Sequence, residues 1–253
     1  MDSLMISAAS GMRARIESLE MLANNMANAT SAGYKSDREA YNLYVSFEAI
    51  EAARMGLSPD ATTAPVIERQ WTDFSQGTLT PTGNPLDLAL SGKGFFAVTG
   101  PQGPLYTRNG SFRLSAEGVL ENQHGYPVRS ATGEPGRPIV LDPALPVEVG
   151  PDGVVQQNGV VIDRIELVDF AGPEALAKRE GVYFHAPDPQ AAQPGPAAAQ
   201  VQQGRLETAN VGPAETAVRL VNVMRQFEML HKAVTMAGEM NRRAVEEVAK
   251  VNP

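Results

Sequence analysis

The amino-terminal part of the chain carries apolar residues at alternating spacings of three and four positions. This is the a/d stripe of a heptad repeat, which is narrower than the apolar face of an ordinary surface helix. The pattern predicts a helix of roughly 26 residues, about 39 Å long. Asn28 and Gly33 then favour a turn. The stripe consists of Met5, Ala9, Met12, Ile16, Leu19, Ala23 and Met26.

The carboxy-terminal part repeats this pattern over a longer stretch. Pro213 stands where the helix would begin, a position that tolerates a missing N–H. Asn241 is the single polar residue on the stripe, and a buried asparagine at such a position fixes the register of a coiled coil. The stripe consists of Leu220, Val223, Phe227, Leu230, Val234, Ala237, Asn241, Ala244 and Val248.

Between the two helices, short apolar segments alternate with turn-forming residues, which favours an antiparallel meander, a sandwich or a small barrel. Asn109-Gly110 separates residues 105–107 from residues 112–114 and predicts a hairpin there. Further turns are expected at residues 117–118, 124–125, 152–153 and 158–159, and one long strand from Val160 to Phe170.

These patterns predict an α+β fold, in which amino- and carboxy-terminal helices form a coiled-coil-like terminal domain around a mainly antiparallel β-domain. The expected divisions are a helix and turn at 1–35, a connecting segment at 36–75 and a β-rich domain at 76–185. A loop rich in Pro, Ala and Gln follows at 186–204, and a strand and helix complete the terminal domain at 205–253.

Each apolar stripe has two interpretations. It is either the core face of a helix in one globular domain, or a seam through which helices pair within and between subunits. The two most regular helices stand at the two ends of the chain, so each other and neighbouring copies are the available apolar partners. Alanine and methionine along the stripes tolerate close, adaptable contacts. We therefore predict assembly seams.

Composition excludes several classes of protein. The chain has 21 basic and 29 acidic residues, and a net charge of −8 disfavours nucleic-acid binding. There are no cysteines, which rules out disulfides and thiolate chemistry. No apolar run approaches the roughly 18 residues needed to span a bilayer, so we expect no stable membrane insertion. The amino terminus lacks the pattern of a cleaved signal peptide.

Candidate chemistry is sparse. The three histidines, His124, His185 and His231, lie far apart and form no ligand motif. Gly92-Lys93-Gly94 lacks the spacing of a phosphate-binding loop and precedes a strand instead of a helix. We expect no catalytic residue, no metal and no cofactor. A β-rich enzyme or sugar-binding module remains an alternative, since sequence does not show which carboxylates lie across a cleft.

The segment that follows the first stripe resembles the motif that ends the first helix of flagellar rod and hook proteins. In that family the pattern is A-N-N-L-A-N-x-x-T-x-G, followed by an aromatic and a basic residue. Met26 replaces the leucine here, and Ser31 replaces the threonine. The matching residues are Ala23, Asn24, Asn25, Ala27, Asn28, Gly33, Tyr34 and Lys35.

Three further blocks are similar to the family in the same order. They are residues 76–96, which contain Asn84-Pro85-Leu86-Asp87, then residues 106–112, and residues 204–211 with Phe227-Glu228 beyond them. The family's proximal rod subunits are most similar, and distal rod or hook-type subunits are the alternative. A phage-tail or adhesin-like fibre is a weaker rival because it does not account for the asparagine-rich motif.

The resemblance implies a non-enzymatic subunit of the rod in the periplasmic part of the flagellar basal body, which transmits torque from motor to hook. Its implied partners are other copies of itself, other rod subunits and the flagellar type III export apparatus, which would export it without a cleaved signal peptide. Isolated helices are marginally stable without tertiary partners, so their order in the free monomer is an open question.

Overall fold

The computed structural model describes residues 3–45, 63–134, 136–188, 190 and 192–251. The chain forms two compact units. Unit 1 comprises Met1–Ala27, Asp37–Trp71 and Pro213–Pro253, and unit 2 comprises Asn28–Ser36 and Thr72–Gly212. The chain therefore passes between the units four times, after residues 27, 36, 71 and 212.

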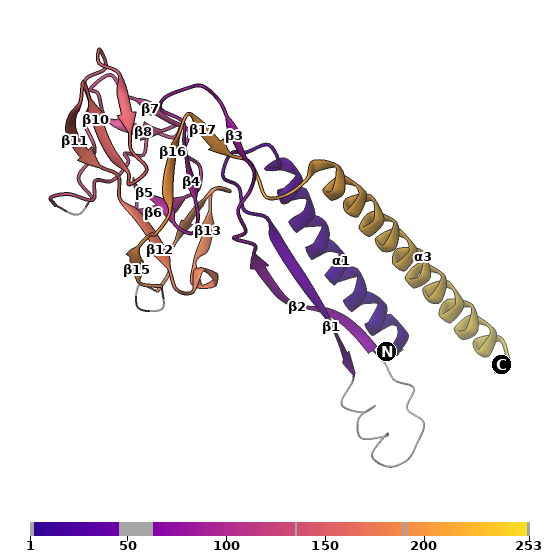
Figure 1. Ribbon diagram of the computed structural model, residues 1–253. Coiled ribbons are helices and arrows are strands. Elements are labelled where there is room, and N and C mark those ends of the chain that lie inside the picture. Colours follow the sequence, from indigo (N-terminus) through magenta and orange to yellow (C-terminus); the bar gives the residue numbers. More distant parts are fainter. Residues whose placement is uncertain (1–2, 46–62, 135, 189, 191, 252–253) are drawn as a thin grey trace. The chain divides into compact units, whose positions relative to one another are not determined.

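Unit 1 is built around two helices. Helix α1 (Ser3–Ala27) contacts helix α3 (Pro213–Val251), and the two run side by side in opposite directions (Figure 1). Strands β1 (Asp37–Val45) and β2 (Thr63–Thr72) pair with each other, and β1 also contacts α1. The expected connecting segment, residues 36–75, thus contributes two strands, and all of their residues except Thr72 belong to unit 1.

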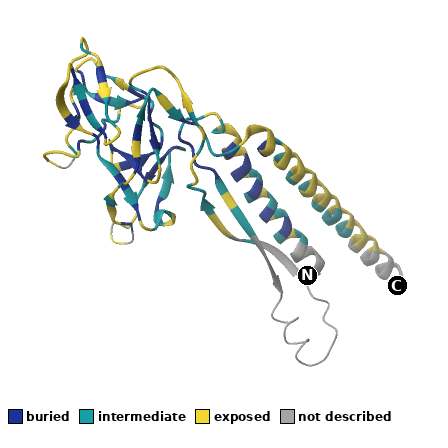
Figure 2. Ribbon diagram, in the orientation of Figure 1, coloured by how far each residue is buried: buried dark blue, intermediate teal, exposed yellow. Residues whose placement is uncertain are grey.

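One side of α1 is buried within unit 1, as Figure 2 shows. Ala14, Ser18, Leu22 and Asn25 recur every three to four residues on this side and are almost inaccessible to solvent. The Ser18 hydroxyl donates to Glu39 Oε1 at 2.6 Å. Because a shift of two residues along a helix rotates the side chain by about 200°, this buried row lies nearly opposite the predicted stripe.

Unit 2 contains the remaining strands and one turn of 3₁₀ helix at η1 (Pro173–Ala175). The first eight strands in order are β3 (Leu79–Pro81), β4 (Leu88–Ser91), β5 (Phe95–Gly100), β6 (Gly103–Thr107), β7 (Phe112–Leu114), β8 (Leu120–Asn122), β9 (Val147–Val149) and β10 (Val154–Gln157). They are followed by β11 (Val160–Arg164), β12 (Leu167–Phe170), β13 (Ala177–Arg179), β14 (Tyr183–His185), β15 (Pro194–Pro196), β16 (Gln200–Gln203) and β17 (Arg205–Glu207).

The largest sheet of unit 2 has six strands in the order β13-β14-β6-β5-β12-β15. A second sheet has the order β11-β10-β9, and β16-β4, β17-β3 and β7-β8 form separate pairs. The ladders described in these sheets are antiparallel. The two helices and the antiparallel sheets confirm the predicted α+β class, whereas the coiled-coil seam stays a prediction.

The core of unit 2 has two apolar clusters. One gathers Phe96, Ile139 and Tyr183 with aliphatic residues from most of the strands, and the other surrounds Phe95 and Phe184. Some rings in the second cluster meet edge-on, with the Tyr106 and Phe170 centroids 4.9 Å apart. Such edge-on contacts stabilise a core beyond the area that they bury.

The hairpin predicted at Asn109-Gly110 is wrong. Strand β6 pairs with β5 and β14, and β7 pairs with β8, so the chain moves from one sheet to another at this point. Gly110 is buried against the backbone of Leu88, whose oxygen lies 1.7 Å from where a Cβ would stand. The glycine here serves close packing between chain segments instead of a hairpin turn.

The long strand predicted from Val160 to Phe170 is also wrong in part, because it divides into β11 and β12, which belong to different sheets. The turns at residues 117–118 and 158–159 are confirmed as the connections of β7 to β8 and of β10 to β11. The range 186–204, expected to be a loop, contains β15 and β16.

Asp163 in β11 holds together a polar cluster in unit 2. Its side chain is buried and accepts hydrogen bonds from the hydroxyls of Ser130 and Thr132 and from the N–H of Arg164, and it pairs with Arg137. Burial alone would raise the pKa of the carboxyl, but these bonds and the arginine charge together hold the pKa below its ordinary value.

Candidate functional site: a buried charged junction

Three charged residues from distant parts of the sequence meet inside unit 2. Lys35 Nζ lies 2.5 Å from Glu207 Oε1, and Arg108 Nη1 lies 3.3 Å from Glu207 Oε2. All three side chains are almost completely buried. Lys35 follows the turn after α1, Arg108 follows β6, and Glu207 ends β17, so the cluster joins three separate chain segments.

Backbone groups satisfy the remaining hydrogen-bonding capacity of this charged junction (Lys35, Arg108 and Glu207). Lys35 Nζ donates to the carbonyl of Ser75 at 2.6 Å, and Arg108 Nη2 donates to that of Gly92 at 2.7 Å. The N–H of Gly77 donates to Glu207 Oε1 at 2.8 Å. Buried charges are tolerated when they are paired and hydrogen-bonded in this way.

Burial dominates the electrostatics of the two cations. It lowers the pKa of the Lys35 ammonium, and the charge and hydrogen bond of Glu207 oppose that change only in part. Burial likewise lowers the pKa of the Arg108 guanidinium, again against the opposing effect of Glu207. Glu207 is therefore the group that keeps both cations stable in this position.

Gly33 and Tyr34 fit the turn after α1 closely into unit 2. Gly33 has φ +67°, and a Cβ there would lie 2.3 Å from the backbone of both Arg108 and Asn109. Its N–H donates to the carbonyl of Glu207 at 2.7 Å. The Tyr34 ring is fully buried, and Lys178 Nζ stands 4.6 Å from the centre of the ring. Only glycine fits the first of these positions.

Asn210 fastens the ends of three segments that lead towards unit 1. Its Oδ1 accepts the N–H of Ser36 at 2.8 Å, and its Nδ2 donates to the carbonyl of Asp73 at 2.7 Å. The Asp73 N–H donates in turn to the carbonyl of Ser36 at 2.8 Å. The chain crosses between the units after residues 36, 71 and 212, and the segments of unit 2 next to these three crossings are thus hydrogen-bonded to one another.

The first half of the predicted asparagine-rich motif lies in unit 1. Asn25 is buried there, and its side chain makes two hydrogen bonds with the backbone of Asp37, at 2.8 and 2.9 Å. Ala23, Asn24 and Ala27 lie on the exposed side of the last turns of α1. Asn28 belongs to unit 2, where its carbonyl accepts the N–H of Ser31 in a turn.

The two predicted stripes differ in their exposure. On α3, the described stripe residues are all half-buried, namely Leu220, Val223, Phe227, Leu230, Val234 and Ala237. On α1, Met12 and Leu19 are half-buried, whereas Ala9, Ile16, Ala23 and Met26 are exposed. The side chains of Met5, Asn241, Ala244 and Val248 lie outside the described part of the structure.

Few groups in the described part of the chain are suited to catalysis. His124 contacts the Tyr183 hydroxyl at 2.8 Å, His185 ends β14, and His231 is exposed on α3 beside Phe227. Within the described ranges, no three His, Asp or Glu side chains are grouped so that they could hold a metal ion. None of the described helices has the length and apolarity required to cross a membrane.

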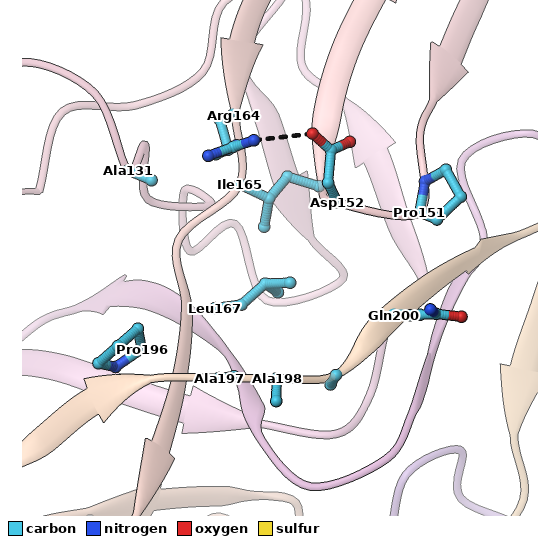
Figure 3. A pocket seen from close by; sticks show the side chains of 11 residues that line it. Ala131, Pro151, Asp152, Arg164, Ile165, Leu167, Pro196, Ala197, Ala198 and Gln200 are labelled. Carbon is cyan, nitrogen blue, oxygen red and sulfur yellow. Dashed lines mark hydrogen bonds and ion pairs between the residues drawn. The ribbon is translucent and has the colours of Figure 1, made fainter.

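A hollow of about 470 Å³ opens in unit 2 between β11, β12 and the residues before β16 (Figure 3). Its wall is largely apolar and includes Pro151, Ile165 and Leu167. Its two charged residues, Asp152 and Arg164, pair with each other at 2.7 Å. Binding sites usually present a few convergent polar groups, and this wall does not supply a free set of them.

The charged junction binds segments of the chain's own fold to one another. Residues 89–157 match the family described as "Flagellar hook protein FlgE/F/G D1 domain", and residues 202–247 match "Flagellar basal body rod FlgEFG protein C-terminal". The chain belongs to the flagellar basal-body rod protein family, whose members are structural proteins of the basal body and not enzymes.

Relatives align over nearly the whole chain. The flagellar basal-body rod protein FlgF of Caulobacter vibrioides is 36% identical, over 92% of this chain and 93% of its own length. FlgF of Mesorhizobium japonicum is 31% identical, over 90% and 89%. FlgG of Buchnera aphidicola (subsp. Schizaphis graminum) is 29% identical, over 91% and 94%. Of these relatives, the two FlgF proteins have the higher identity and FlgG follows. This order confirms the prediction from the sequence that the chain is most similar to proximal rod subunits, with distal rod subunits as the alternative.

Sequence reasoning singled out Lys35 but did not identify Arg108, Glu207 or Asn210 as site residues. All three stand inside the blocks that carry the family resemblance, at residues 106–112 and 204–211. A signal was present for Arg108, which directly follows the strand-forming segment Leu105-Tyr106-Thr107, whereas Glu207 ends a segment that already contains Arg205. Glu207 lies 172 residues from Lys35 in the sequence, and no local pattern shows that the two residues pair.

Proposed function

We propose that this chain is a proximal rod subunit that polymerises through its terminal helices and transmits torque from the motor towards the hook. The observation that carries the proposal is that the α1–α3 pair leaves apolar side chains uncovered on both helices. A helix pair that served only as a core would bury these side chains. An open, head-to-tail contact between such faces generates a helical filament instead of a closed ring.

The exposed apolar face of α3 is the larger of the two. Val218, Met229, Met236 and Met240 follow one another at 11, 7 and 4 residues and therefore share one side of the helix. Each is more than half exposed. On α1, Ile16 is 44% exposed. Exposed apolar patches of this kind commonly mark protein–protein contacts.

Transmission of torque through the subunit requires that the segments of unit 2 next to the passages are firmly held. The segments that leave unit 2 after Ser36 and Gly212, and that enter it at Thr72, are joined by the hydrogen bonds of Asn210 and Asp73. Within unit 2, Lys35 and Gly33 in the turn after α1 both bind Glu207. These hydrogen bonds hold the segments to one another inside unit 2.

We further propose the rod's periplasmic region as the site of assembly, other copies of the chain and other rod subunits as its partners, and the flagellar type III apparatus as its export route. Proximal placement is supported by FlgF relatives at 36% and 31% identity, against 29% for FlgG of Buchnera aphidicola (subsp. Schizaphis graminum). The position can be tested by identifying neighbours of the subunit through cross-linking in purified basal bodies.

The experiment for polymerisation is Leu230→Asp as the only copy of the protein in a motile strain. Leu230 is half-buried on the predicted stripe of α3. A charge at this position is expected to prevent incorporation into the rod and to abolish motility, while the purified variant retains the hydrogen-exchange protection of unit 2. A motile strain with normal basal bodies would refute polymerisation through the predicted stripe of this helix.

A further inference from the structure

The charged junction has an unequal balance of charges. Two buried cations share one carboxylate, because Lys35 binds Glu207 Oε1 and Arg108 binds Glu207 Oε2. Lys35 and Arg108 also contact carbonyl oxygens and the Phe95 ring, which carry no full charge, and the carboxylates of Asp73 and Asp169 act on Lys35 and Arg108, respectively, more weakly than Glu207 does. Without Glu207, the site would hold two like charges in a medium of low polarity, where repulsion is strong.

The three residues also occupy very different places in the chain. Lys35 and Arg108 belong to the first half of the sequence, whereas Glu207 stands at the end of β17, the last strand. Strand β17 pairs with β3 through Glu207 and Leu79, which places the carboxylate between the two cations. The neutralising group therefore arrives only when the carboxy-terminal end of unit 2 has docked.

We propose that Glu207 is an electrostatic latch, which makes the docking of the turn after α1 onto unit 2 depend on the presence of β17. Before β17 docks, the positive charges of Lys35 and Arg108 keep residues 33–36 away from the segment after β6. When Glu207 enters, the same charges attract the turn, and the N–H of Gly33 bonds to the carbonyl of Glu207. The turn formed by residues 33–36 is held in unit 2 only in a chain whose strand β17 is in place.

The latch operates in the isolated monomer and does not depend on polymerisation. It makes a prediction that a merely space-filling role does not make. If repulsion between two unneutralised cations opens the turn, then removing one of the cations should close it again. If Glu207 acts only through shape and hydrogen bonding, a second substitution in the same cluster should add to the damage.

Hydrogen exchange of the full-length chain, read at residues 33–36, tests the latch. Glu207→Gln keeps the shape of the side chain and removes its charge, and it is expected to accelerate exchange there on the order of 100-fold or more. The double variant Lys35→Met/Glu207→Gln removes the repulsion but leaves Arg108 without its carboxylate, so its exchange is expected to be slower than that of Glu207→Gln and faster than that of the wild type. Exchange in the double variant as fast as in Glu207→Gln, or faster, would overturn the latch.

Glu166→Gln is the matched control, because Glu166 is paired with Arg129 at 2.6 Å in a partly exposed position away from the charged junction. It is expected to leave exchange at residues 33–36 unchanged. If Glu207→Gln prevents unit 2 from folding, the double variant decides the matter: recovery of a folded unit supports the latch, and an equally unfolded double variant refutes it. Wild-type exchange in Glu207→Gln also refutes it.

Discussion

Lys35 donates a hydrogen bond of 2.5 Å to the carboxylate of Glu207, although 172 positions separate the two residues in the chain. The pair links the turn that follows the amino-terminal helix to the strand that precedes the carboxy-terminal helix. Both side chains are fully buried. Neither would be stable there alone, since burial of an unpaired charge is strongly unfavourable. The turn after α1 and strand β17 therefore meet at the same point of unit 2.

Replacement of Gly33 by alanine should destabilise unit 2 severely. The new Cβ would overlap the backbone of Arg108 and Asn109, each 2.3 Å away, at a φ of +67° that side chains disfavour. We expect a loss of more than about 3 kcal/mol in the free energy of unfolding. Urea denaturation followed by circular dichroism measures this loss.

Gly83→Ala is the matched control for that substitution. Gly83 has a similar φ of +76°, but no atom lies within 4 Å of its Cβ position. Only the backbone strain of about 1–2 kcal/mol should appear. Equal losses for the two variants would show that the close fit of the turn against residues 108–109 contributes nothing.

Asn210→Ala should remove the side-chain hydrogen bonds that join the chain segments at Ser36 and Asp73. The substitution removes the acceptor of the Ser36 N–H and the donor to the Asp73 carbonyl. We expect a cost of about 1–3 kcal/mol and faster hydrogen exchange at Ser36. Asn84→Ala removes hydrogen bonds in a local turn and serves as the control, with exchange at Ser36 unchanged. Unchanged exchange at Ser36 in Asn210→Ala would contradict this role.

Acid should destabilise unit 2 partly through Asp163. The folded-state pKa of this carboxyl lies below its ordinary value, because the hydrogen bonds of Ser130 and Thr132 and the charge of Arg137 outweigh the effect of burial. The unfolded chain therefore takes up the proton first. The stabilising contribution is complete above the unfolded-state pKa of about 3.9 and is lost as the pH falls through the lower folded-state pKa.

The measurement is the free energy of unfolding at several pH values between 6 and 2 for the wild type and Asp163→Asn. The variant should be less stable at neutral pH, and the difference between the two proteins should shrink as the pH falls. A difference that stays constant with pH would show that ionisation of Asp163 contributes nothing to stability.

The sequence predicted the elements whose pattern is local. Heptad spacing located both helices, and Asn158-Gly159 located the turn between β10 and β11, where both residues have positive φ. The prediction failed where a residue that resembles a local turn signal is required by a distant segment of the chain. Asn109-Gly110 has the sequence of a hairpin turn, but Gly110 is required by the close backbone of Leu88. The charged junction escaped prediction because its three members meet only after the sheets have formed.

The central claim is that the exposed face of α3 assembles the rod, and Met236→Asp tests it most directly. Met236 is 59% exposed, so the free energy of unfolding of the monomer should change by no more than about 0.5 kcal/mol. Thr235→Asp introduces the same charge on a different side of α3, which carries Glu228 and His231 together with Met224, and serves as the control.

The decisive measurement is the amount of each variant in basal bodies purified from strains in which it is the only copy. The account predicts that Thr235→Asp is incorporated like the wild type, and that Met236→Asp is absent from the basal bodies although it is folded and stable. Incorporation of Met236→Asp at the wild-type level would contradict assembly through this face.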